Sequence, residues 1–198
     1  MTLSRSSSYP ILVLSVALGT ASWASAGEKP VVNLTAFAVD MSSPGSETRT
    51  GRLDITIVRW STDAERESLR EALIAKGSDA LLTALQGTKP RVGYIQTATG
   101  VGWDLRYARQ YRTGDGTRRI VIATDRPISY WEAANGARSA DYEFTLAEVR
   151  LPKNGKGTGK LVNAAKVSWN KETRAIEVEN YENEPVRLSE IVATRSAK

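Results

Sequence analysis

Most of the chain alternates between apolar and polar residues, and a single stretch follows a helical period. Leu53, Ile55 and Ile57 alternate with polar neighbours, which is typical of a half-buried strand. Further strand-like segments are separated by turn residues, and they lie at 31–40, 91–99, 102–112, 117–125, 141–151, 160–169, 174–181 and 185–193. Short connections force neighbouring strands to be antiparallel, because parallel crossovers need a dozen or more residues.

The helical stretch is the segment 62–87. Thr62 is followed three residues later by Glu65, which is the pattern of a capping box. Leucines recur at helical spacing from residue 69 to residue 85, and Gly77 and Gly87 are placed to end two helices. The sequence therefore predicts an α+β fold, in which a large curved antiparallel β-sheet forms a barrel or a sandwich and carries one inserted helical hairpin.

Two strands allow finer predictions. In the strand 102–112, alternation places Trp103, Leu105, Tyr107 and Tyr111 on one face and the arginines at 106 and 112 on the other. In the strand 141–151 the apolar residues change faces after residue 146, which predicts a β-bulge near Ala147–Glu148.

The first 26 residues have the pattern of a signal peptide. Arg5 precedes an apolar run at 11–21, and Ala24-Ser25-Ala26 is a sequence that signal peptidase accepts. The run is too short to span a bilayer. We therefore expect residues 27–198 to form a single exported domain, periplasmic or extracellular, with no transmembrane segment.

The composition excludes much of enzyme chemistry. The chain contains no cysteine and no histidine, which removes the Ser-His and Cys-His nucleophile pairs and the usual ligands of zinc, copper and haem. We expect no catalytic residues, no cofactor and no transition metal. Paired carboxylates remain as the basis of an alternative function, a glycan hydrolase, and the candidates are Asp104, Asp125, Glu132, Asp141 and Glu143.

Charge is unevenly distributed along the chain. Residues 91–126 contain seven arginines and three aspartates, and residues 150–171 contain six basic residues and no acidic one. Residues 172–190 contain six glutamates and two arginines. Basic and acidic segments either pair across neighbouring strands or form a polarised surface, and pairing is favoured.

Four arginines around the turn at 113–116 are the candidate site: Arg106, Arg112, Arg118 and Arg119. Guanidinium groups suit phosphate, sulfate and uronate oxygens. The expected partner is therefore an anionic polymer or a lipid headgroup, and no nucleic acid is expected. The glutamates at 143 and within 172–190 are the alternative partners of these arginines.

Tyr130 and Trp131 form a second candidate site, for a small apolar ligand or a sugar, if they are exposed. If they are buried, they close one end of the sheet. The leading hypothesis is an exported, non-enzymatic domain that binds an apolar or anionic ligand. The alternatives are the carboxylate-based glycan hydrolase and a structural envelope protein.

Five segments also resemble a known family. They are RWSTDAER (59–66), KPRVGYI (89–95), DLRYAR (104–109), RIVIATDRPISYWEA (119–133) and ENYENEPVRLSEI (179–191). In this order the chain resembles an uncharacterised family of exported bacterial proteins, a domain of unknown function. The resemblance implies a single domain and an exported bacterial location, and it implies no activity or site residue.

Overall fold

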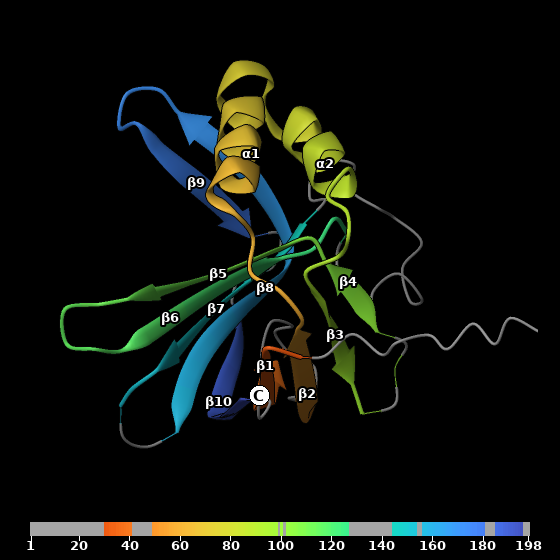
Figure 1. The fold of residues 1–198 in the computed structure, drawn as a ribbon, viewed down its shortest axis with the longest axis vertical. Coiled ribbons are helices and arrows are strands. Elements are labelled where there is room, and N and C mark those ends of the chain that lie inside the picture. The colour runs from red at the N-terminus through yellow and green to blue at the C-terminus, as the bar shows by residue number, and fades with distance from the viewer. Residues whose placement is uncertain are drawn as a thin grey trace, which may run out of the picture.

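The computed structural model describes residues 30–40, 49–98, 100, 102–126, 144–153, 156–180 and 185–195. Ten strands and two helices lie within these ranges (Figure 1). In chain order they are β1 (Val32–Asp40), β2 (Arg49–Ile57), α1 (Asp63–Lys76), α2 (Ser78–Gln86), β3 (Gly93–Thr97), β4 (Trp103–Leu105), β5 (Tyr107–Arg112), β6 (Arg118–Ala123), β7 (Phe144–Leu151), β8 (Gly157–Asn170), β9 (Ala175–Asn180) and β10 (Val186–Arg195). The predicted α+β fold, with its large antiparallel sheet and helical hairpin, is confirmed.

The ten strands form one antiparallel sheet with two ends. Its order is β4-β3-β2-β1-β10-β8-β7-β6-β5, and β9 pairs with the second half of β8. The terminal strands β4 and β5 do not pair with each other, so the sheet is curved but not closed into a barrel. The β8–β9 hairpin leaves the body of the sheet beside α1, and the β5–β6 hairpin projects to the side (Figure 1).

The predicted strand 102–112 is interrupted at Arg106. Leu105 pairs with β3, whereas Tyr107 pairs with β6, so the segment changes partner strand at this residue. Leu105 and Ala108 are both fully buried in the same core cluster, whereas strict alternation would place residues three positions apart on opposite faces of a strand. The predicted alternation is therefore wrong beyond Arg106: Tyr107 does not share a face with Leu105, because the bend at the corner shifts the pattern by one residue.

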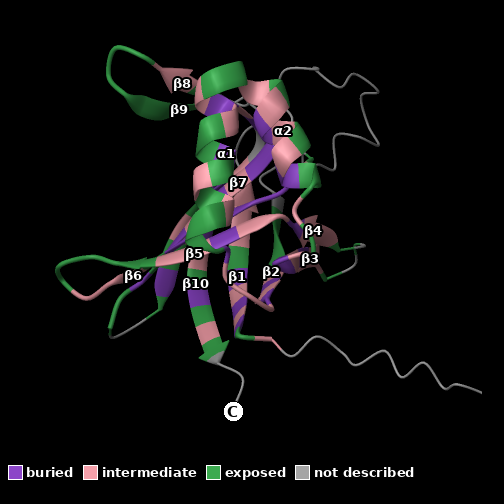
Figure 2. Ribbon diagram, turned by 45° about the horizontal axis from the view of Figure 1, so that its top comes forward, coloured by how far each residue is buried: buried purple, intermediate pink, exposed green. Residues whose placement is uncertain are grey.

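The main core lies on the inner face of the curved sheet. Alternate residues of β1, β2 and β10 point into it, among them Leu34, Ile55 and Leu188, all at most 2% exposed. Buried residues alternate with intermediate ones at the start of β1 and with intermediate or exposed ones along β10 in Figure 2, as expected for a sheet with one solvated face. Burial of this face is the main stabilising contribution, since each fully buried aliphatic side chain contributes about 1.5–3 kcal/mol.

A second core cluster joins the helices to the sheet. Leu69 and Leu73 of α1, with Leu81 and Leu85 of α2, pack with Phe144, Ala165 and Val167 of β7 and β8. The start of β7 is therefore buried on both faces, because Phe144 contacts the helices while Val149 lies in the main core. The change of apolar phase along this strand needs no bulge at Ala147–Glu148, and that prediction is wrong. The register shift lies between Phe144 and Leu146, where β7 pairs with β8.

Candidate anion-binding surface

Two hairpin ends meet at one side of the sheet. The β5–β6 turn at 113–117 and the end of β7, which residues 152 and 153 follow, lie at the same side of the molecule (Figure 1). They are neighbours because β6 pairs with β7 in an unbroken register. The structure thus brings together the arginine-rich segment around residue 113 and the start of the basic segment 150–171.

Arginines face one another across these strands. Arg112 lies opposite Arg118 in the β5–β6 pair, and Arg119 lies opposite Arg150 in the β6–β7 pair. The first pair is on the face that carries the main core, and the second is on the outer face. Like charges directly opposite each other in a sheet are destabilising unless counter-charges intervene.

One carboxylate lies between the two outer arginines. Glu148 accepts a hydrogen bond from Arg119 Nη2 at 2.5 Å and another from Arg150 Nε at 2.6 Å. Partial burial alone would raise the pKa of Glu148, but the hydrogen bonds from Arg150 and Arg119 lower it. Glu148 is therefore ionised near neutral pH, and the two guanidinium groups share its single negative charge.

The arginines on the other face have a neutral partner. Gln110 Oε1 accepts from Nη2 of Arg118 at 2.7 Å and from Nε at 3.1 Å. Arg112 is exposed, and within the described part of the chain it makes no side-chain hydrogen bond or ion pair. An amide does not neutralise a guanidinium, so Gln110 supplies no counter-charge on this face.

Lys153 joins the arginines from the neighbouring turn. Gly116 has φ +81°, and a Cβ at this position would lie 2.2 Å from Cε of Lys153. The lysine side chain therefore runs directly over the tip of the β5–β6 hairpin. We define the cationic surface as the side chains of Arg112, Arg118, Arg119, Arg150 and Lys153. The strands β5, β6 and β7 and the turn 113–117 contribute two carboxylates, Glu148 and Asp115, against these five cations.

The candidate residue Arg106 lies apart from this surface. Its Nε is 3.1 Å from Asp125 Oδ2 and its Nη2 is 3.7 Å from Asp104 Oδ2. Six residues of extended chain separate it from Arg112, a distance of about 20 Å. Only Arg112, Arg118 and Arg119 of the four candidate arginines are brought together. Arg106 is instead occupied in the bend between β4 and β5.

The second candidate site, Tyr130 and Trp131, lies outside the described residues, as do the carboxylates Glu132, Asp141 and Glu143. The apolar-ligand site and a hydrolase site built on them stay predictions. The remaining two hydrolase candidates, Asp104 and Asp125, are both bound by the same guanidinium.

Basic and acidic segments pair along the other side of β8. Lys156 forms an ion pair with Glu190 of β10, and Lys166 lies opposite Glu179 of β9. Glu179 and Glu190 thus lie against the basic hairpin, whereas the carboxylate that pairs with Arg119 is Glu148. The cross-strand pairing favoured from the sequence therefore holds for part of the basic segment only.

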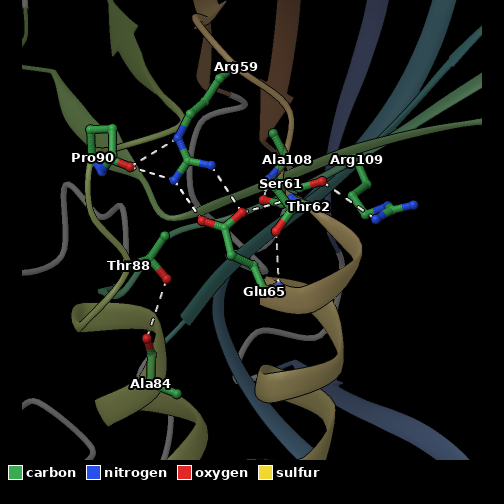
Figure 3. Close-up of polar contacts among 9 residues, drawn as sticks. All are labelled: Arg59, Ser61, Thr62, Glu65, Ala84, Thr88, Pro90, Ala108 and Arg109. Carbon is green, nitrogen blue, oxygen red and sulfur yellow. Dashed lines mark hydrogen bonds and ion pairs between the residues drawn. The ribbon is translucent and has the colours of Figure 1, made fainter.

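The densest polar network is the junction between helix α1 and the sheet (Figure 3). Arg59 donates to both oxygens of Glu65 at 2.9 and 3.0 Å and to the carbonyl oxygen of Pro90 at 2.6 Å. Glu65 also accepts from the backbone N–H of Thr62, which completes the predicted capping box. The arginine pointing at Glu65 lowers the pKa of that carboxyl. Arg59 thus links Glu65 at the start of α1 to the backbone that precedes β3, and the network anchors the helix to the sheet.

Arg150 and Lys153 belong to the surface but were not among the predicted site residues. Both belong to the basic segment 150–171, whose excess of positive charge is evident in the sequence. Their position beside Arg118 and Arg119 depends on the pairing of β6 with β7, which connects strands separated by residues 124–143. No local pattern specifies that register.

The chain matches no protein-family model, no curated protein and no solved structure. Neither of the two described helices is long and apolar enough to cross a membrane. The resemblance to an uncharacterised exported family stays a prediction.

Proposed function

We propose that the protein is an exported, non-catalytic domain that binds an oxyanion-bearing ligand on the cationic surface. The observation that carries the proposal is the placement of guanidinium groups opposite each other on both faces of neighbouring strands, Arg112 with Arg118 and Arg119 with Arg150. Such pairs weaken a sheet unless counter-charges intervene, and Glu148 supplies a single negative charge to the two outer guanidinium groups. A bound anion would relieve that repulsion, and guanidinium groups form strong charge-assisted hydrogen bonds to phosphate, sulfate and carboxylate oxygens.

The composition supports the same function. A chain without histidine or cysteine has few groups for nucleophilic or metal chemistry, but it needs neither to bind an anion. The signal-peptide pattern in residues 1–26 supports the exported location.

The test compares two double variants of equal charge. Arg112→Ser/Arg119→Ser removes two cations from the surface. Arg52→Ser/Arg70→Ser removes two exposed cations that are not part of it, one from β2, near the other end of the sheet order, and one from helix α1. Binding of the mature domain to immobilised heparin, to inorganic polyphosphate and to phosphatidylglycerol vesicles is measured at several salt concentrations.

We expect the surface variant to lose roughly tenfold in affinity per guanidinium removed, with its melting temperature unchanged or raised. The control variant should bind within about twofold of the wild type, because exposed charges beyond a Debye length are screened. Equal losses in the two variants would show that binding follows net charge alone, and absence of binding to every probe would reject the proposal. The three probes separate polysaccharide, free phosphate and lipid headgroup as sources of the anion.

A further inference from the structure

An aromatic ring lies directly beside the cationic surface. Tyr111 is 40% exposed and lies opposite Arg119 in the β5–β6 pair, on the outer face of the sheet. Its hydroxyl is 3.4 Å from that of Tyr107, and the guanidinium carbon of Arg109 is 5.9 Å from its ring centre. Arg109 is itself held by Asp63 at 2.7 Å. Tyr107 and Arg109 thus hold the Tyr111 ring in place, while a large part of the ring faces solvent.

The ring begins a row of side chains that crosses four strands. Tyr111, Arg119, Arg150 and Thr158 occupy successive register positions on β5, β6, β7 and β8. Adjacent strands are about 4.8 Å apart, so the row extends over about 15 Å. A single small anion covers only part of this length, whereas an oligomeric ligand can contact the whole row.

The row is not purely cationic, because Glu148 lies between its two arginines. An ionised carboxylate accepts hydrogen bonds and repels phosphate groups. A ligand that carries hydroxyl groups as well as anionic groups can donate to Glu148 while its anionic groups bind the guanidinium groups. A polyphosphate has no such donors. The mixture of arginine, carboxylate, hydroxyl and ring therefore fits a polyhydroxylated acid better than a simple polyanion.

We propose that the cationic surface binds an acidic polysaccharide, with its carboxylate or sulfate groups on Arg119 and Arg150 and the apolar face of one sugar ring on Tyr111. This inference rests on the proposed function and names its ligand class. Single-stranded nucleic acids also stack on aromatic side chains, but they are bound by several successive rings. Tyr111 is the one aromatic residue among the four of the row, and the neighbouring Tyr107 packs against the second core cluster.

The test separates the ring from the charge. Tyr111→Ala removes the stacking surface, and Tyr111→Phe keeps it. Phe37→Ala is the matched control, because Phe37 is also an exposed ring, 45% exposed, but lies on β1 away from the cationic surface. Each variant is titrated with heparin oligosaccharides, with alginate oligosaccharides and with inorganic polyphosphate of similar charge, and the wild type also with oligothymidylate and with phosphatidylglycerol vesicles.

We expect Tyr111→Ala to weaken binding of the oligosaccharides by roughly five- to tenfold and to leave polyphosphate binding within twofold. Tyr111→Phe and Phe37→Ala should bind like the wild type. Glu148→Gln should strengthen polyphosphate binding, since it removes a repelling charge, and should not strengthen oligosaccharide binding.

Three outcomes would overturn the inference. If the wild type binds polyphosphate, oligothymidylate or phosphatidylglycerol vesicles but neither oligosaccharide, the ligand class is wrong while the proposed function stands. If Tyr111→Ala weakens all probes equally, at unchanged melting temperature, the ring makes no contact specific to a sugar. If no probe binds, the inference and the proposed function both fail.

Discussion

Nε of Arg106 lies 3.1 Å from Oδ2 of Asp125. Arg106 stands at the bend between β4, which pairs with β3, and β5, which pairs with β6. Both side chains are largely buried, with 17% and 10% of their surface exposed. The other oxygen of Asp125 is buried without a hydrogen bond from any described residue. The ion pair therefore fixes the corner of the sheet, and Asp125 depends on Arg106 for its main partner.

Arg106→Gln is the first prediction, and it should lower the free energy of unfolding by about 1–3 kcal/mol, because it removes the nearer charged partner of a buried carboxylate and leaves only Nε of Arg126, 3.9 Å from Oδ1 of Asp125. Urea denaturation at pH 7 measures the change. Arg52→Gln is the control, since the Arg52–Asp54 pair has an arginine that is 62% exposed. Exposed pairs contribute at most about 1 kcal/mol. Equal effects of the two substitutions would contradict the structural role given to Arg106.

A second prediction concerns Glu65 and acid stability. Hydrogen bonding from Arg59 lowers the pKa of Glu65 below its ordinary value of 4.5. The stabilisation is then fully present above that pH and is lost as the pH falls through the lowered pKa of the folded state. Glu65→Gln should lower the free energy of unfolding by about 1 kcal/mol at pH 7. The variant should also lose less stability than the wild type between about pH 5 and pH 3, because it lacks this titrating carboxyl.

The matched control for this prediction is Glu67→Gln on the same helix. Glu67 pairs with Arg70, and both side chains are more than 40% exposed, so its loss should change stability by less than about 0.5 kcal/mol. Denaturation curves collected from pH 3 to pH 7 compare the two variants with the wild type. Parallel pH profiles for the wild type and Glu65→Gln would contradict the prediction.

The strands and helices were predictable because local patterns specify them. Leu53, Ile55 and Ile57 do alternate into the core, and Thr62 and Glu65 do cap α1. The corner at Arg106 was not predictable. An alternating pattern continues through residue 106 in the sequence, and only the partner strands reveal that β3 lies on one side of the bend and β6 on the other.

The cationic surface was partly predictable for a related reason. The excess of arginine near residue 113 is a property of composition, and it identified Arg112, Arg118 and Arg119. Whether an arginine has a carboxylate partner depends on long-range register. Glu148, for example, lies 29 residues from Arg119 along the chain. For the same reason, no local sequence pattern distinguishes Arg106, which is paired and largely buried, from Arg112, which is exposed.

A third prediction tests the close packing of β2 against β3. A Cβ on Gly93 would lie 2.1 Å from the carbonyl oxygen of Thr56, a backbone atom. Gly93→Ala should therefore destabilise the fold by about 3 kcal/mol, because the strands must separate. Gly51→Ala on β2 is the control, since a Cβ there meets nothing within 4 Å. This control should be neutral or slightly stabilising. A melting temperature for Gly93→Ala equal to that of Gly51→Ala would contradict the described packing.

The last prediction concerns Asp115, the carboxylate at the tip of the β5–β6 hairpin. Hydrogen bonds from Thr113 and Thr117 lower the pKa of Asp115 to about 2, so it is ionised throughout the range from pH 4 to pH 8. Asp115→Asn removes this charge from beside the cationic surface, and retention on immobilised heparin should increase at low salt by an amount that is constant over that range. Asp79→Asn makes the same change of net charge on α2 and should leave retention unchanged. An increase that fades between pH 8 and pH 4 would mean that Asp115 becomes protonated in this range, and equal retention of both variants would mean that heparin does not approach the hairpin tip.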